Sequence, residues 1–260
     1  MNKTLCPIPW MSQSYRANGD IRVCCQAQHG PTGGILKDED GNVINARDSD
    51  LNQIRNAPIE KDIRKAMMNG ERHPECIRCH TEEDAGMTSR RMLENKLWIK
   101  GGWNQIKEED KFTWEYLLEN TQVDGTIDTA AIGNSFFDVR FGNLCNLKCT
   151  MCNPLVSSKI AAEQKRLGTL PKWWEGPIII DQSKKMDMDK FRDDLKKILP
   201  TTNQIEIVGG EPLMYPKVAG FIQWIVENNM SSHLELRFVT NAMTENFEVF
   251  ALFKYFRKVT

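Results

Sequence analysis

Residues 143–154 read NLCNLKCTMCNP and place Cys145, Cys149 and Cys152 in the spacing C-x3-C-x2-C. A compact loop with this spacing can bring three thiolates onto one face of an iron–sulfur cubane and leave the fourth iron without a protein ligand. A structural or zinc-binding role is the alternative, but it would need a fourth ligand, and the loop contains neither a His nor a fourth Cys. The pattern therefore favours a cluster with one open iron.

Strand and helix patterns alternate on both sides of this loop, from residue 136 to the end of the chain. Period-two alternation of apolar residues predicts strands over residues 137–141, 205–208 and 234–238. Apolar residues at helical spacing predict helices over residues 155–167, 188–199, 218–226 and 247–253. We expect Thr244 to be the N-cap of the last helix. Strand–helix repeats of this length predict a parallel sheet with right-handed crossovers.

A second motif, Gly209-Gly210-Glu211-Pro212, follows the second predicted strand. Parallel α/β folds bind ligands at the C-terminal ends of their strands, and both motifs are predicted to lie there. CNLKCTMC, with the bulky Met151 before its last cysteine, and GGEP one crossover later resemble the signature of the radical S-adenosylmethionine (SAM) superfamily. In that superfamily GGEP helps to hold the amino group of SAM, so the resemblance implies cofactor-binding roles for these four residues and Met151.

The resemblance also implies a reaction. Cys145, Cys149 and Cys152 would bind a 4Fe–4S cluster, and the amine and carboxylate of SAM would chelate its open iron. The reduced cluster would cleave SAM, and the 5′-deoxyadenosyl radical would abstract hydrogen from a substrate, with the protein excluding water and oxygen. An electron donor such as a flavodoxin or ferredoxin would be required. Thr240 and Asn241 would either face the cofactor or form a plain strand-to-helix turn.

Another set of cysteines lies near the N-terminus, where Cys6, Cys24, Cys76 and Cys79 are spaced C-x17-C-x51-C-x2-C. This spacing resembles the twitch module, a shortened relative of the SPASM domain, in which four cysteines hold an auxiliary 4Fe–4S cluster. The resemblance extends into the opening CPIPW and into Glu82, Gly86, Ser89 and Arg90. It implies that the four cysteines hold a second, closed cluster whose role is electron transfer, for example from a substrate radical.

Other interpretations of these cysteines remain open. Two pairs of cysteines could also bind zinc. Residues 76–80 read CIRCH, the attachment motif for c-type haem, but that chemistry belongs to exported proteins and the chain shows no signal peptide. We expect Cys25 to be a small buried residue beside Cys24, or to exchange roles with it. The alternative to this haem motif is that His80 is a surface residue after the last ligand.

Composition excludes several classes of protein. The 260 residues include 34 Lys and Arg and 35 Asp and Glu, so the net charge of −1 argues against a protein that wraps nucleic acid. No run of eighteen apolar residues is present, so no membrane span is predicted. We predict a cytoplasmic protein. In a reducing compartment, eight clustered cysteines are more often metal ligands or catalytic groups than disulfides.

We therefore predict an α/β protein with three regions. Residues 1–83 form a small, loop-rich iron–sulfur module with helices near 51–55 and 61–68, and residues 84–134 form a connector with a helix near 90–98. Residues 135–260 form the N-terminal half of a radical-SAM (β/α) barrel, incomplete after about three strands, which cannot close a barrel. A longer protein is the expected source. In the relatives the twitch module follows the barrel, whereas here it comes first.

The predicted function is that of a radical SAM enzyme acting on a peptide or protein, or on a small molecule. Peptides are preferred because SPASM and twitch relatives often act on them. The alternative is a non-enzymatic metal-binding or redox protein with a structural zinc or iron–sulfur site.

Overall fold

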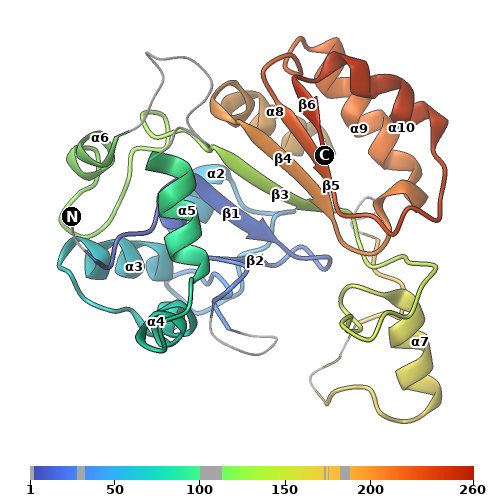
Figure 1. Cartoon of the computed structure of the whole chain (residues 1–260), viewed down its shortest axis with the longest axis horizontal. Helices are drawn as coiled ribbons and strands as arrows, with labels where there is room; N and C mark the ends of the chain where they lie inside the picture. The colour runs from blue at the N-terminus through green and yellow to red at the C-terminus, as the bar shows by residue number, and fades with distance from the viewer. Residues whose placement is uncertain (1–2, 28–32, 100–112, 173, 175, 182–187) are drawn as a thin grey trace. The chain divides into compact units, whose positions relative to one another are not determined.

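The computed structural model describes residues 3–27, 33–99, 113–172, 174, 176–181 and 188–260. The chain divides into two compact units (Figure 1). The first consists of Met1–Ser14, Asp20–Phe137 and Asp193–Asn203, and the second of Tyr15–Gly19, Asp138–Arg192 and Gln204–Thr260. The four N-terminal cysteines all belong to the first unit, and the three central cysteines belong to the second.

Six strands are hydrogen bonded in the order β2-β1-β3-β4-β5-β6. They are β1 Ser12–Tyr15, β2 Ile21–Arg22, β3 Phe136–Arg140, β4 Gln204–Val208, β5 Glu235–Phe238 and β6 Lys258–Val259. β4 pairs with β5 in parallel, Ile205 opposite Leu236, and β5 pairs with β6 in parallel, Leu236 opposite Val259. The predicted α/β class is confirmed, and each of the three predicted strands is found within a residue or two of its expected bounds.

Two strands of the first unit escaped prediction. β1 is only four residues long and every one of them is buried, so its sequence SQSY has no alternation between a buried and an exposed face. β2 has two residues, Ile21 and Arg22. Period-two alternation is a usable signal only where one face of a strand meets solvent.

The helices of the first unit begin and end close to the expected positions where the pattern is strong. They are α1 Ile8–Met11, α2 Leu51–Arg55, α3 Pro58–Met68, α4 Ile77–Asp84, α5 Arg90–Ile99 and α6 Trp114–Glu119, with 3-10 turns η1 Pro74–Cys76 and η4 Leu199–Thr201. α2 starts after Asp50, whose carboxylate accepts a hydrogen bond from the Gln53 N–H at 2.8 Å. The helices α1, α4 and α6 were not predicted.

The second unit contains α7 Ser158–Arg166, α9 Pro216–Glu227 and α10 Phe247–Leu252, with 3-10 turns η5 Pro212–Met214 and η6 Phe253–Tyr255. α8 Met188–Ile198 contains the boundary between the units. α7 begins three residues later than expected because Ser157 caps it, accepting a hydrogen bond from Ile160 N–H. The prediction that Thr244 caps the last helix is wrong, since the Asn246 side chain caps α10 by accepting from Val249 N–H.

Each unit has its own apolar core. In the first, Trp10 packs edge-on against Trp114 with ring centroids 5.6 Å apart, and Ile63 and Met67 of α3 are buried. In the second, the rings of Phe141 and of Phe221 in α9 pack with their centroids 5.5 Å apart. Burying one such side chain stabilises a fold by roughly 1.5–3 kcal/mol.

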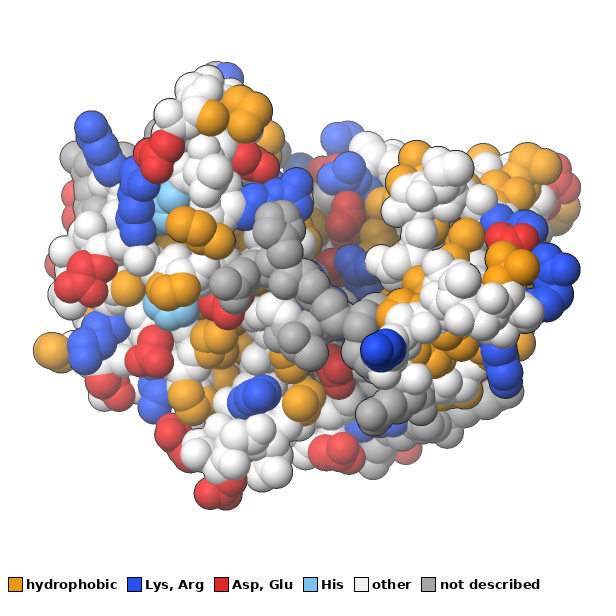
Figure 2. Space-filling model, turned by 90° about the horizontal axis from the view of Figure 1, so that it is seen from below, with side chains coloured by type: hydrophobic (Ala, Val, Ile, Leu, Met, Phe, Trp, Pro, Cys, Tyr) orange, Lys and Arg blue, Asp and Glu red, His pale blue; other side chains and the backbone are white. Residues whose placement is uncertain are grey.

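None of the helices in the described ranges is both long and apolar enough to cross a membrane. On the face shown in Figure 2, acidic and basic side chains are interspersed, in keeping with a net charge of −1.

Candidate metal centres

The three central cysteines lie on the loop that joins β3 to α7 in the second unit. Cys145 is buried, and Cys149 and Cys152 are half-buried. The Leu147 N–H points at Cys145 Sγ from 3.5 Å, and Cys152 N–H donates to the Cys149 carbonyl at 3.0 Å. Burial raises the pKa of the Cys152 thiol, and the neighbouring Cys149 and Cys145 sulfurs raise it further. The Cys152 sulfur is therefore close enough to those of Cys145 and Cys149 for their charges to interact.

Asn143 fixes the start of this loop. Its side chain is fully buried, donates to the carbonyls of Pro154 at 2.9 Å and Ile178 at 3.0 Å, and accepts from Ile180 N–H at 2.7 Å. Asn143 thus connects both ends of the cysteine loop to residues 178–180. The sequence analysis did not single out Asn143. The signal that could have found it is a polar side chain just before the first cysteine of the loop.

Three hydroxyl groups hold other parts of the loop. The Ser158 hydroxyl accepts from Cys145 N–H at 3.2 Å, and the Ser157 hydroxyl donates to the Leu147 carbonyl at 2.9 Å. The buried Tyr215 hydroxyl accepts from Leu144 N–H. The loop backbone is therefore fixed by groups that carry no charge.

The GGEP turn lies against the same loop. Gly210 N–H donates to the Val156 carbonyl at 3.1 Å, and Glu211 N–H donates to the Leu144 carbonyl at 2.7 Å. Gly210 has φ +61°, and a Cβ there would meet the Leu144 carbonyl oxygen at 2.2 Å. Only glycine allows this approach. The two motifs that carry the resemblance are thus in direct contact.

Glu211 is fully buried, and its carboxylate has three partners. It accepts from Leu213 N–H at 3.1 Å, from the Thr240 hydroxyl at 2.7 Å and from Asn241 N–H at 2.8 Å. The Asn241 side chain in turn donates to Asn146 Oδ1 at 2.8 Å and lies 4.0 Å from Cys145 Sγ. The turn after β5 is therefore joined to the cysteine loop through Glu211.

The remaining predicted cofactor residues lie in different surroundings. Gly209 has φ +91° and lies against Arg140, and Pro212 is buried as the first residue of η5. Met151 is 86% exposed, so its side chain is available to a ligand or partner but contributes little to the core.

The four N-terminal cysteines are brought together in the first unit. Cys6, Cys24, Cys76 and Cys79 all line one cavity, although 73 positions separate the first from the last. The unfilled space between the cavity walls, part of it open to solvent, is about 450 Å³. Apolar side chains form much of the wall: Ile8, Pro9, Val23, Ala27, Ile63 and Met67.

Backbone N–H groups lie near three of these four sulfurs. Gln26 N–H donates a hydrogen bond to Cys24 at 3.3 Å, and the N–H groups of Ile8 and Arg91 act to lower the pKa of Cys6 and of Cys79. Such hydrogen bonds stabilise thiolates and help to set the reduction potential of iron–sulfur clusters.

The thiols are protonated at neutral pH when no metal is bound. Burial, together with the nearby Cys79 sulfur, raises the pKa of Cys76 to about 12. Burial also raises the pKa of Cys6 and of Cys79, and a hydrogen bond with Cys25 together with burial raises the pKa of Cys24. Four thiolates in one cavity repel each other, so a bound cation is what would stabilise them.

Two predictions about neighbours of these cysteines are wrong. Cys25 is exposed rather than buried, because Cys24 turns its sulfur toward the Gln26 N–H and the cavity. His80 is 2% exposed rather than on the surface. Its Nδ1 lies 3.8 Å from a Glu83 carboxylate oxygen, and burial lowers its pKa, so it is neutral at pH 7.

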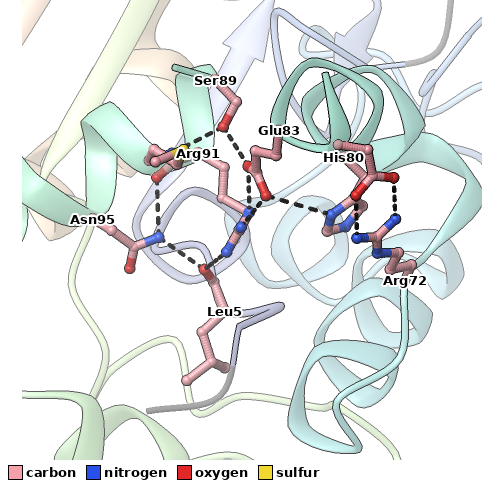
Figure 3. Close-up of polar contacts among 9 residues, drawn as sticks. Leu5, Arg72, His80, Glu83, Ser89, Arg91 and Asn95 are labelled. Atoms are coloured by element: carbon pink, nitrogen blue, oxygen red, sulfur yellow. Dashed lines mark hydrogen bonds and ion pairs between the residues drawn. The ribbon is translucent and has the colours of Figure 1, made fainter. Parts of the chain in front are cut away.

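Glu83 and Arg91, which sequence reasoning passed over in favour of Glu82 and Arg90, form an ion pair beside the cavity (Figure 3). Glu82 instead pairs with Arg78 on the exposed side of α4. The signal that could have found Glu83 is its position four residues after Cys79, on the same face of α4.

The donor sets fit the two clusters implied by the resemblance. Three thiols lie on one loop next to a glycine turn, and four thiols line one cavity. Among the residues that the structure describes, no three His, Cys, Asp or Glu side chains are arranged so that they could hold a metal ion. In a 4Fe–4S cluster each cysteine binds a different iron, so the thiolates need not converge on one ion.

Comparison of the chain with models of protein families, with curated proteins and with solved structures found no match. Its function must therefore be argued from its own residues.

Proposed function

We propose that this chain is a radical SAM enzyme with a second, auxiliary 4Fe–4S cluster. The observation that carries the proposal is the direct contact between the three-cysteine loop and the GGEP turn. Glu211 N–H and Gly210 N–H both donate to carbonyls of the segment that contains the cysteines. A structural zinc site has no use for this pairing of motifs.

Cys145, Cys149 and Cys152 would hold the catalytic cluster. The cluster and SAM supply, when bound, the one-electron chemistry that generates a radical able to abstract hydrogen from the substrate. The chain's own residues position these groups: Asn143 and the hydroxyls around it fix the thiols, and the Gly209-Gly210 turn presents backbone without side chains beside them. Close backbone approach to a ligand is the usual reason for glycines in such a turn.

The GGEP turn would bind the amino group of SAM through its backbone carbonyls. The Glu211 carboxylate is less suited to this, because three donors from the chain already hold it. Its role in the proposal is to keep the turn after β5 next to the cysteine loop. The exposed Met151 would contact the cofactor from the outer side of the loop.

Cys6, Cys24, Cys76 and Cys79 would hold the auxiliary cluster. Since all four line the cavity, that cluster would have no open iron, and its role would be electron transfer rather than chelation of a substrate. The apolar wall would limit access of water and oxygen to it.

The proposal also covers the barrel, the substrate and the electron donor of the enzyme. The strands β3 to β6 would be part of a (β/α) barrel. The substrate would be a peptide, a protein or a small molecule, and a flavodoxin or ferredoxin in the cytoplasm would supply electrons. These assignments come from the resemblance of the motifs.

Iron, acid-labile sulfide and zinc per chain, measured after anaerobic reconstitution, test the proposal. We expect about eight irons and eight sulfides, and about four of each when Cys145, Cys149 and Cys152 are all changed to Ala. Reductive cleavage of SAM to 5′-deoxyadenosine should be lost in the same variant.

Other outcomes contradict different parts of the proposal. About four irons with one zinc would keep the radical enzyme but replace the auxiliary cluster by a structural metal. Absence of iron would exclude the radical SAM function for this chain.

A further inference from the structure

We propose that Arg91, held in place by Glu83, positions two ligands of the auxiliary cluster and raises the reduction potential of that cluster. This inference rests on the auxiliary cluster proposed above. Neither Arg91 nor Glu83 is among the residues that carry the resemblance.

Arg91 is connected to both ends of the N-terminal cysteine set. It lines the cysteine cavity, and its side chain pairs with Glu83, which lies on the same helix, α4, as Cys79. The guanidinium Nη1 donates to the Leu5 carbonyl at 3.2 Å, directly before Cys6 in the chain. One residue therefore connects two ligands that lie 73 positions apart.

Glu83 fixes the orientation of the Arg91 side chain. Its carboxylate accepts from Arg91 Nε at 3.0 Å and from Nη2, and it also accepts from the Ser89 hydroxyl (Figure 3). The two side chains are 12% and 14% exposed, so solvent screens the pair only in part. An arginine with two fixed donor directions loses less freedom per hydrogen bond than a lysine would.

Asn95 reinforces the same connection from one turn further along α5. Its amide donates to the Leu5 carbonyl at 2.8 Å and to the Arg91 carbonyl at 3.0 Å, as Figure 3 shows. The Leu5 carbonyl thus accepts two side-chain donors from α5. The segment that carries Cys6 is thus joined through α5 to α4, the helix that carries Cys79.

Other charges lie near the cavity as well. Glu75 and Arg90 line it, and Arg90 forms an ion pair with Glu94. The charge of Glu94 acts to raise the pKa of Cys6, and that of Glu60 acts to raise the pKa of Cys76. Arg91 differs from all of these because it combines a charge at the cavity with bonds to two ligand segments, to Glu83 on the helix of Cys79 and to Leu5 before Cys6.

The charge of Arg91 gives the potential its expected direction. Reduction adds one negative charge to a cluster that four thiolates already make anionic, and a nearby cation stabilises the reduced form. Glu83 offsets part of that effect, because its carboxylate lies beside the guanidinium. Removing the cation should lower the potential, whereas neutralising Glu83 should raise it.

The test is a redox titration of the full chain in which Cys145, Cys149 and Cys152 are Ala, so that only the auxiliary cluster is observed. Reconstitution with iron and sulfide is followed by measurement of iron content, the EPR spectrum and the midpoint potential. The variants are Arg91→Gln, Arg91→Lys and Glu83→Gln. Asp84→Asn is the matched control, since Asp84 follows Glu83 on α4 and forms an exposed ion pair with Arg72 at 2.6 Å.

We expect opposite shifts from the two partners of the ion pair. Arg91→Gln should lower the ratio of reduced to oxidised cluster at a fixed potential at least tenfold. For one electron, this corresponds to a fall of 59 mV in the midpoint potential. Glu83→Gln, which keeps an oxygen for Arg91 and Ser89, should shift it upward. Arg91→Lys should retain most of the potential but less of the iron, because a lysine cannot contact both Glu83 and Leu5 in the same geometry. Asp84→Asn should change neither quantity.

Two results would overturn the inference. If Arg91→Gln and Glu83→Gln shift the potential in the same direction, or no further than Asp84→Asn, the pair has only a structural role. If the chain with the three Ala substitutions binds no cluster while the intact chain binds about four irons, the auxiliary cluster itself is excluded and this inference with it. Should Arg91→Gln fail to bind a cluster, the direction of the Glu83→Gln shift decides between the same two conclusions.

Discussion

Different kinds of polar group stabilise the two units that contain the cysteines. In the unit with four cysteines, Arg55, Glu60 and Arg64 are completely buried, and the two arginines donate to backbone carbonyls of distant segments. In the unit with three cysteines, Asn143 and Tyr215 hold the loop through neutral groups.

The origin of the ligands explains this difference. The three central cysteines lie within one loop, so short hydrogen bonds from the loop's own neighbours are enough to fix them. The four N-terminal cysteines come from three separate segments. Arginines can reach several carbonyls at once: Arg64 donates to those of Gly125 at 2.6 Å, Pro9 at 2.8 Å and Arg55 at 2.8 Å.

Removal of iron should affect the two units most unequally. We expect chelation to expose cleavage sites in the first unit about tenfold more than in the second, because metal-binding energy there holds distant segments together. Limited proteolysis of the reconstituted chain, before and after chelation, with mass-spectrometric mapping of the fragments, measures this difference. Equal protection of both units after chelation would contradict the comparison.

The buried carboxyl group of Glu60 should make the stability of the first unit depend on pH. Burial raises its pKa to about 8, above the usual value near 4.5, despite the attraction of Arg64 at 3.9 Å. Because the folded state keeps this proton longer than the unfolded state does, its contribution to stability is lost as pH rises from about 4.5 to about 8.

Glu60→Gln should remove that loss. Its stabilising effect should grow between about pH 6 and about pH 8, to a difference on the order of a few kcal/mol, in urea unfolding of the chain. A parallel stability difference at both pH values would mean that Arg64 and Arg55 keep Glu60 ionised in the folded state.

Loss of the Asn143 hydrogen bonds in the second unit should lower the stability of the chain by a similar amount. Asn143→Ala leaves the Pro154 and Ile178 carbonyls and the Ile180 N–H without their partner, and we expect a loss of about 2–4 kcal/mol in the free energy of unfolding. Asn153→Ala is the control on the same loop. Its single exposed bond to Leu155 N–H should be worth about 0.5–1 kcal/mol. Similar losses from the two variants would show that Asn143 does not anchor the loop.

Sequence patterns predicted the second unit better than the first. Alternation in β3, β4 and β5 and the helical spacing in α9 arise from faces that meet either core or solvent, and such periodicity is visible in the sequence. The contact between the GGEP turn and the loop followed from the rule that parallel strands end at one edge.

The organisation of the first unit depends on long-range contacts that local sequence patterns do not reveal. The resemblance to the twitch module implied that Cys6, Cys24, Cys76 and Cys79 come together. The buried Arg55 and Arg64, whose long-range hydrogen bonds hold distant segments of this unit, gave no such signal. A shift of one residue also separates the exposed Glu82 from the buried-side Glu83, because adjacent residues on a helix point about 100° apart. The residues in the charged support of the cavity were therefore found only in the structure.

The smallest effect we expect comes from one methyl group at the junction of the two motifs. Gly210→Ala places a Cβ 2.2 Å from the Leu144 carbonyl oxygen at φ +61°, and the loss should be about 2 kcal/mol, with weaker iron binding by the three-cysteine loop. Gly220→Ala, in α9 with open space around its Cβ, should instead gain about 0.5–1 kcal/mol. Unfolding and iron content of both variants separate a general effect of alanine from a local one. If Gly210→Ala binds iron as the unmodified chain does, the close approach of turn and loop is not required for the catalytic cluster, and the contact that carries the proposed function would lose its importance.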